Sequence, residues 1–188
     1  SIRFGREFNK IKVRGQTLTV GAGTPNSRLS NVAREKSLGG LEFLCGIPGN
    51  LGGSIRMNAG AFDREVKDIV KKVRAITGKG EPVLLSPQQI KFGYRNSNCS
   101  PSLIFVEAIL QGRISDHETI SKNMLKIQSE RQVRQPVKQP TGGSTFMNPP
   151  GLLAWKLIEQ AGCRGLVRGG AQVSNKHCNF LILSLIHI

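Results

Sequence analysis

The chain has 188 residues, of which 38% are hydrophobic, enough to form the core of a folded domain. Lys and Arg number 27 against 12 Asp and Glu, which gives a formal net charge of +15 and favours anionic partners such as nucleotide phosphates. The basic residues are scattered and no stripe of aromatic residues accompanies them, which argues against a groove for nucleic acid. The four cysteines form no C-x-x-C pair and no run of 18 apolar residues occurs, so neither a zinc site nor a transmembrane helix is expected.

The first predicted elements are a β-hairpin and a helix. Two short runs rich in β-formers, Ile11–Val13 and Thr17–Val20, flank turn residues at 14–16. The sequence Gly-Ala-Gly-Thr-Pro at 21–25 ends the second strand, and Pro25 suits the first turn of a helix. That helix is expected to stop at the glycine pair 39–40, and its apolar positions are Leu29, Val32 and Ala33.

Later segments predict two strands and two helices. The strands are Ile69–Thr77 and Leu103–Leu110. Ser115 has capping-box spacing to a glutamate at 118 and begins a helix that ends before position 136. Leu152–Ala161 predicts a further helix with one apolar face and Gly162 just beyond its end; that face carries Leu153, Leu157 and Ala161. Strands and helices mix without a regular βαβ repeat, which indicates the α+β class.

Residues 46–62, GIPGNLGGSIRMNAGAF, contain five glycines and no acidic residue. Glycine inside a helix or strand costs about 0.5–1 kcal/mol relative to alanine, so this stretch indicates backbone that approaches a ligand closely. The common phosphate-binding motifs are absent. Gly21-x-Gly23 would need a third glycine at position 26 for a Rossmann fingerprint, but that residue is Asn26, and no glycine precedes Lys-Ser or Lys-Thr as in a P-loop. A long irregular loop is the alternative, but the alternation of apolar with small or polar residues favours buried backbone.

Four ordered stretches resemble the UDP-N-acetylenolpyruvoylglucosamine reductase family. They are Leu41–Phe62, FGYRNS at 92–97, TGGSTFMNPPG at 141–151 and Ala154–Ile182. The similarity covers residues 1–182, and the lack of a long insertion after Tyr-Arg-x-Ser resembles the shorter, alphaproteobacterial type. Leu183–Ile188 instead match the translation of a transposon end used in sequencing-library preparation, so we interpret them as an adaptor-derived tail. A genuine apolar strand is the alternative for this tail.

The resemblance implies an α+β fold with two domains. Residues 1–114 would be the C-terminal part of an FAD-binding domain of the vanillyl-alcohol-oxidase type, and residues 115–182 a truncated substrate-binding domain. The family's N-terminal Gly-x-Gly-Ser-Asn turn and its C-terminal catalytic glutamate match no residue here, so we expect the 188-residue chain by itself to be inactive. The family also implies a monomer.

The resemblance further implies an NADPH-dependent, FAD-mediated reduction of UDP-N-acetylglucosamine enolpyruvate to UDP-N-acetylmuramate, in cytoplasmic peptidoglycan synthesis. No metal, membrane or nucleic-acid partner is implied. Ser144 matches the proton donor, and Arg95 matches the arginine that faces the substrate carboxylate and enolate. The implied substrate-binding residues are Tyr94, Asn148, Gln172 and His177. The implied FAD contacts are Val20, Gly21, Ala22, Gly23, Gly46, Ile47, Pro48, Gly49, Gly52, Gly53, Asn58, Ala59 and Gly60.

Other interpretations of these residues stay open. Ser144 could be a turn serine, Arg95 a surface ion-pairing residue, Asn148 a helix N-cap and His177 a strand histidine without a role. The whole chain could belong to another flavoprotein of the same superfamily, to a basic binding module without catalysis, or to an inactive gene fragment. The motifs at 92–97 and 141–151 argue against the first of these.

Overall fold

The computed structural model describes residues 4–183, and the chain divides into two compact units, Ser1–Gln128 and Ser129–Ile188. The division therefore falls later than residue 114, where the sequence analysis placed the domain boundary. Among the described residues, no helix is long and apolar enough to cross a membrane.

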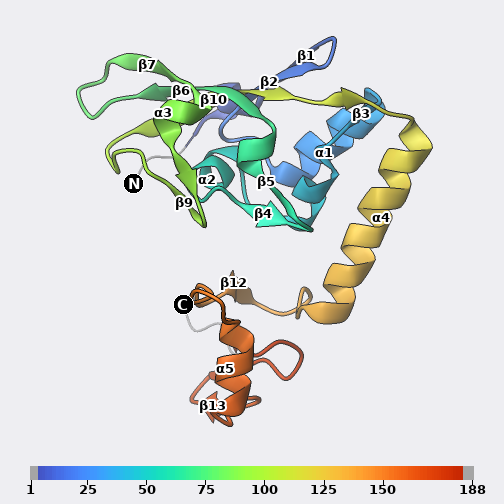
Figure 1. Ribbon diagram of the computed structural model, residues 1–188, viewed down its shortest axis with the longest axis vertical. Helices are drawn as coiled ribbons and strands as arrows, with labels where there is room; N and C mark the ends of the chain where they lie inside the picture. The colour runs from blue at the N-terminus through green and yellow to red at the C-terminus, as the bar shows by residue number, and fades with distance from the viewer. Residues whose placement is uncertain (1–3, 184–188) are drawn as a thin grey trace. The chain divides into compact units, whose positions relative to one another are not determined.

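The first unit is built on a five-stranded antiparallel sheet in the order β1-β2-β10-β6-β7. In Figure 1 this sheet covers helices α1 and α2. The predicted hairpin is confirmed, with Ile11 opposite Val20. Antiparallel pairing throughout this sheet confirms the α+β class. The strands are β1 (Ile11–Arg14), β2 (Thr17–Gly21), β6 (Val70–Ile76), β7 (Pro82–Leu85) and β10 (Ile104–Gln111).

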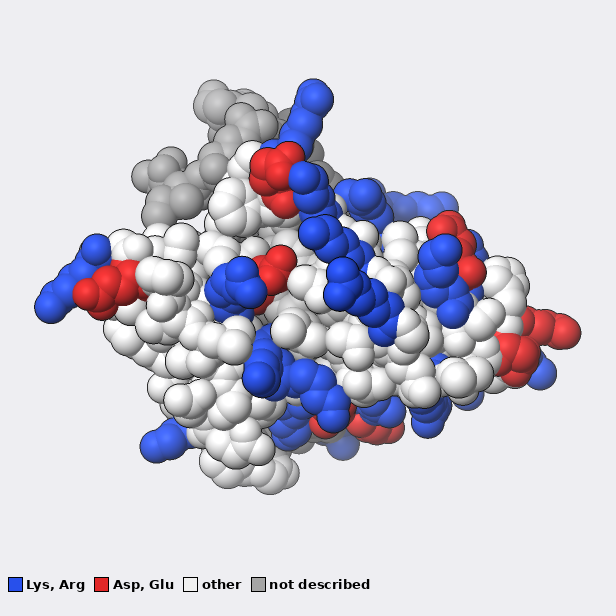
Figure 2. Space-filling model, turned by 90° about the horizontal axis from the view of Figure 1, so that it is seen from above, with Lys and Arg blue, Asp and Glu red and all other residues white. Residues whose placement is uncertain are grey.

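The two faces of the sheet differ in polarity because strand side chains alternate. One face packs on the core, to which Leu18, Val73 and Leu110 each contribute a fully buried side chain. The other face is rich in Lys and Arg (Figure 2), among them the exposed Lys72 and Arg74. The sheet therefore presents positive charge on its outer face.

Helices and short turns complete the first unit. The helical segments are η1 (Arg6–Asn9), α1 (Asn26–Glu35), η2 (Glu42–Gly46), α2 (Leu51–Arg56), η3 (Val66–Asp68), α3 (Pro87–Ile90) and α4 (His117–Arg134), the last of which runs into the second unit. The short strand pairs are β3 (Leu38–Gly39) with β11 (Arg113–Ile114), β4 (Gly60–Ala61) with β5 (Arg64–Glu65), and β8 (Phe92–Gly93) with β9 (Asn96–Ser97). Leu29 of α1 and Leu51 and Ile55 of α2 are fully buried, so both helices pack onto the core of the sheet.

Two predicted helix boundaries are wrong. Helix α1 ends at Glu35, before the glycine pair, because Ser37 has a φ of 54° and the next residues pair with β11. Helix α4 is capped by Asp116 and not by Ser115, since the Thr119 amide donates to Asp116 Oδ1 at 2.7 Å. This hydrogen bond lowers the pKa of the Asp116 carboxyl.

Beyond the end of α4, the described part of the second unit consists of a helix and a four-stranded antiparallel sheet. The sheet has the order β12-β15-β14-β13, with β12 (Thr141–Ser144), β13 (Val167–Arg168), β14 (Ala171–Val173) and β15 (Phe180–Leu183), and the helix is α5 (Ala154–Gln160). Gly162 has the expected left-handed conformation beyond α5, with a φ of 69°. The predicted buried face of this helix is not found: Leu153 and Leu157 are 41% and 39% exposed, and Ala154 is the buried residue. Leu183 lies in β15, and the remaining tail residues 184–188 lie outside the described part.

Candidate functional site

The two segments predicted to contact a cofactor are joined by hydrogen bonds. The amide of Gly52 donates to the Ala22 carbonyl at 2.8 Å. Asn26 is fully buried, and its Nδ2 donates to the Ile47 carbonyl at 3.2 Å and to Ser54 Oγ at 2.7 Å. Residues 21–26 and 46–56 therefore form one structural block, in which Asn26 is a supporting residue that the sequence analysis missed.

Several of the glycines are required by the protein's own packing. A Cβ atom on Gly21 would lie 2.1 Å from the Phe8 carbonyl oxygen, and one on Gly60 would lie 2.8 Å from the Arg64 carbonyl oxygen. On Gly46 it would lie 3.0 Å from Ile127 of α4. Gly21 and Gly60 are therefore explained without a ligand, whereas at Gly46 a small shift of the Ile127 side chain could make room for a Cβ atom.

Gly53 is different because neither its conformation nor its packing calls for glycine. It lies inside α2, its φ is not positive, and a Cβ atom there would have no neighbour within 4 Å. It lines a cavity of about 440 Å³ together with Ala22, Gly52 and Phe105. A glycine inside a helix costs stability, so the open space at Gly53 indicates a group that lies against α2.

Arg56 lines the same cavity and is the one charged residue between positions 46 and 62. Its guanidinium donates to the carbonyls of Ser100, at 3.1 Å, and Leu103, and it lies 4.4 Å from the ring centroid of Phe105. Arg56 therefore fastens the loop before β10 to the end of α2. Its isolation among uncharged residues was a signal that the sequence analysis did not use.

Other predicted FAD contacts are engaged inside the protein. Val20 is fully buried in the core. The amides of Ala22, Gly23 and Ala59 donate to the carbonyls of Val106, Phe8 and Ser54, all at 2.8–2.9 Å. These three amides and the Gly52 amide already donate to carbonyls of the protein, so they are not the amides that would bind a pyrophosphate.

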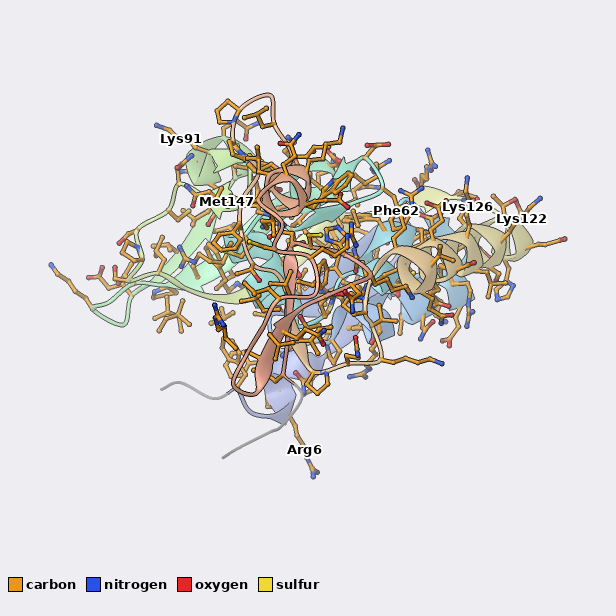
Figure 3. The ribbon with its side chains drawn as sticks, turned by 90° about the horizontal axis from the view of Figure 1, so that it is seen from below. Arg6, Phe62, Lys91, Lys122, Lys126 and Met147 are labelled. Carbon is orange, nitrogen blue, oxygen red and sulfur yellow. The ribbon has the colours of Figure 1, made fainter. Side chains whose placement is uncertain are left out.

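A second cavity, of about 540 Å³, lies at the β8–β9 hairpin. The turn of this hairpin consists of Tyr94 and Arg95, and both residues line the cavity together with Asn58 and Gly60. Figure 3 labels Lys91, directly before this hairpin, and Phe62, in the turn between β4 and β5. The structure thus brings the Tyr-Arg-x-Ser motif and the end of the glycine-rich stretch to one cavity. The charged residues that complete its lining are Asp63, Arg64, Glu65, Lys67 and Asp68.

Arg95 has a φ of 50°, in the left-handed region. For a residue other than glycine this conformation costs on the order of 1–3 kcal/mol, and such residues cluster at functional sites. The half-buried side chain belongs to the lining of the cavity, which also contains the acidic residues Asp63, Glu65 and Asp68, so the ion-pairing alternative for Arg95 stays open.

In the second unit, Ser144 and Gln172 lie on the two strands that flank β15. Ser144 is opposite Phe180, and Gln172 is opposite Ile182. Asn148 Oδ1 accepts a hydrogen bond at 3.0 Å from the backbone amide of Ala154, the first residue of α5, but the N-cap residue of this helix is Leu153 and not Asn148. This hydrogen bond uses only the oxygen of the Asn148 carboxamide, and its Nδ2 group carries two N–H donors that take no part in it.

His177 is held by contacts within its own unit. Its ring lies at 4.8 Å from the Phe180 ring and 6.4 Å from the Trp155 ring, and Nδ1 accepts from the Asn179 amide at 3.2 Å. Burial is the main reason why the pKa of His177 is below its usual 6.5. These contacts favour a neutral, structural histidine.

We predict that protonation of His177 lowers the stability of the second unit in acid. Because folded His177 binds a proton more weakly than unfolded His177, its stabilising contribution is complete above pH 6.5 and is lost as the pH falls through the lowered folded pKa. The fluorescence of Trp155, the single tryptophan, should report a falling unfolding midpoint in that range. In His177→Gln this part of the pH dependence should vanish; an unchanged pH profile would contradict the assignment.

Two family models and a solved structure match this chain. Residues 1–86 match the model of an FAD binding domain, and residues 135–184 match that of the UDP-N-acetylenolpyruvoylglucosamine reductase C-terminal domain. The crystal structure of this reductase from Thermus caldophilus superposes with a TM-score of 0.89 at 34% identity, covering 98% of this chain and 67% of that one. The chain belongs to the UDP-N-acetylenolpyruvoylglucosamine reductase family. The resemblance found in the sequence and its α+β fold are thereby confirmed.

Curated members of the reductase family are similar along nearly the whole chain. The reductase of Paramagnetospirillum magneticum is 49% identical over 181 residues, which are 96% of this chain and 59% of the relative. That of a Bradyrhizobium species is 48% identical over 177 residues, which are 94% of this chain and 58% of the relative. The chain thus spans about three fifths of the length of these reductases.

Proposed function

We propose that the whole protein reduces UDP-N-acetylglucosamine enolpyruvate to UDP-N-acetylmuramate, with FAD bound and NADPH as co-substrate. The whole protein here means residues 1–182 with the segments that complete them to the length of their relatives. The main support is that one chain combines an FAD-binding match, which includes Gly53 and Arg56 of the cavity beside α2, with a reductase-specific C-terminal match. We assign residues 1–114 to the cofactor domain and residues 115–182 to the substrate domain.

FAD, when bound, supplies hydride transfer from NADPH to the enolpyruvyl double bond. The open side of α2 at Gly53, next to the Arg56 guanidinium, fits a flat or anionic group of such a cofactor. We assign to Arg95 the binding of the substrate carboxylate and of the charge that develops beside it. Ser144 would then donate the proton to carbon.

Other proposed substrate contacts follow from the same assignment. Tyr94 adjoins Arg95 in the hairpin turn, and 51% of its surface is exposed. Asn148 would offer its amide donors while its oxygen accepts from the Ala154 amide. Gln172 and His177 would border the substrate; each already contacts its own unit, Gln172 through a 3.4 Å hydrogen bond to the Gly165 carbonyl.

We place this activity in the cytoplasm, where it would serve peptidoglycan synthesis and thereby cell shape and division. The proposed state is a monomer whose partners are the UDP-sugar and the two cofactors. The basic sheet face is then a solvated surface, without nucleic acid or membrane.

Product analysis tests the proposed reaction. With purified whole protein, oxidation of NADPH should require the enolpyruvyl UDP-sugar, and mass spectrometry should find one UDP-N-acetylmuramate for each NADPH consumed. NADPH oxidation that depends on oxygen but not on the UDP-sugar would instead indicate another flavoprotein of the superfamily.

Gly53→Leu should weaken flavin binding by at least about tenfold, which corresponds to about 1.4 kcal/mol. The new side chain would fill the cavity beside α2 while leucine favours a helix, so the fold should persist. The checks are flavin absorbance per protein after gel filtration and the unfolding midpoint of the apoprotein.

Gly5→Leu is the matched control, because a Cβ atom there also meets open space, at a φ of −75°. Full flavin retention in Gly53→Leu, or equal losses in both variants, would contradict the placement of the cofactor against α2.

A further inference from the structure

Asn58 connects the glycine-rich stretch to the hairpin that carries Arg95. Only 1% of its surface is exposed. Its Nδ2 donates to the Gly93 carbonyl at 3.0 Å, and its Oδ1 accepts from the Lys67 amide at 3.0 Å. One carboxamide therefore joins α2's C-terminal side to the β8–β9 hairpin and to the turn η3.

The hairpin itself is short and depends on contacts from outside. Its strands pair only as Phe92 with Ser97 and Gly93 with Asn96. The Gly93 carbonyl that Asn58 holds directly precedes the Tyr94-Arg95 turn. On the outer side, the exposed Asn98 donates to the Lys91 carbonyl at 2.6 Å.

The conformation of Asn58 supports a dedicated role. Its φ is 40°, which asparagine tolerates better than most residues other than glycine. Because a buried carboxamide is costly unless its hydrogen bonds are made, both partners hold this side chain in one orientation. Arg95, two residues beyond Gly93, is itself in a left-handed conformation, so the strained turn is fixed from the core by Asn58.

We propose that Asn58 is a positioning residue that holds Arg95 in place for the reduction of the substrate. The family resemblance implies a cofactor contact at Asn58, but its side chain is hydrogen-bonded to the hairpin and to η3. The inference rests on the proposed role of Arg95. It predicts that loss of this side chain harms the step that uses Arg95 and spares the reduction of the flavin by NADPH.

Asn58→Gly tests this inference in the whole protein. Glycine accepts the positive φ without strain and removes both side-chain hydrogen bonds. Flavin content and flavin reduction by NADPH should stay near normal, whereas flavin reoxidation by the enolpyruvyl substrate should slow by up to about 100-fold, the cost of misplacing a catalytic group by about 1 Å. Amide hydrogen exchange in residues 92–98 should become faster.

A double variant separates positioning from general damage. If Asn58 acts through Arg95, Asn58→Gly should slow reoxidation much less in an Arg95→Lys background than in the wild-type background. The proposal would be overturned if the slowing of reoxidation in the double variant equalled the product of the slowing in the two single variants. It would also be overturned if Asn58→Gly slowed both half-reactions equally. Normal reoxidation in Arg95→Lys would instead overturn the proposed role of Arg95 itself.

The exposed Asn98→Ala gives a second test that does not disturb the core. It removes the hydrogen bond to the Lys91 carbonyl and loosens the same hairpin from outside. If Asn58→Gly does not fold, a reoxidation defect in Asn98→Ala that disappears in the Arg95→Lys background supports the positioning of Arg95 by its hairpin anchors. Faster hydrogen exchange in this hairpin with unchanged reoxidation would contradict it.

Discussion

Ser144→Ala in the whole protein should slow reoxidation of the flavin by the enolpyruvyl substrate by about 10²–10⁴-fold, the contribution expected of a general acid. Reduction of the flavin by NADPH should proceed near its normal rate, because the hydroxyl is assigned only to protonation of carbon. The substitution removes one oxygen at the end of β12 and adds no bulk, so the pairing with Phe180 should persist.

Stopped-flow absorbance of the flavin resolves the two phases. Ser129→Ala, an exposed change on α4, is the control and should leave both phases unchanged. If both phases slow together in Ser144→Ala, the residue maintains the shape of the site. If neither slows, the proton comes from another group.

Arg95→Lys should cost about 2–4 kcal/mol of transition-state stabilisation, by analogy with the loss of an oxyanion donor. Lysine keeps the positive charge but loses the planar guanidinium that binds a carboxylate through two parallel hydrogen bonds. The thermal midpoint should change little, because the half-buried side chain lines a cavity and packs outside the core.

Steady-state kinetics and the unfolding midpoint together check this expectation. Arg14→Lys is a matched control: this exposed arginine also adjoins a β-turn, between β1 and β2, on the sheet away from the cavity. Wild-type turnover in Arg95→Lys would show that Arg95 has no role in the reaction.

Local patterns were sufficient for much of the fold. The hairpin of β1 and β2 follows from two runs of β-formers around a short turn, and the C-terminal glycine of α5 follows from sequence spacing. The cap of α4 was misplaced because Ser115 and Asp116 both suit an N-cap, and only the side-chain geometry selects Asp116.

The site was less predictable from the sequence because a glycine can be required by a ligand, by the packing of the protein itself or by the backbone conformation. Gly21 is required by the approach of Phe8, a contact between separate segments that no local pattern encodes, whereas Gly53 meets open space. The resemblance predicted contacts to the cofactor at these positions, but it did not separate these causes. It also gave no indication that Asn58 bonds to the Arg95 hairpin, since that contact spans 35 positions of the chain.

A single-turnover experiment without oxygen tests the central claim most directly. The whole protein is first reduced with one equivalent of NADPH, and one equivalent of the enolpyruvyl UDP-sugar is then added. We predict that the flavin absorbance returns completely and that one equivalent of UDP-N-acetylmuramate forms. A flavin that stays reduced until oxygen is admitted would contradict the proposed reductase activity.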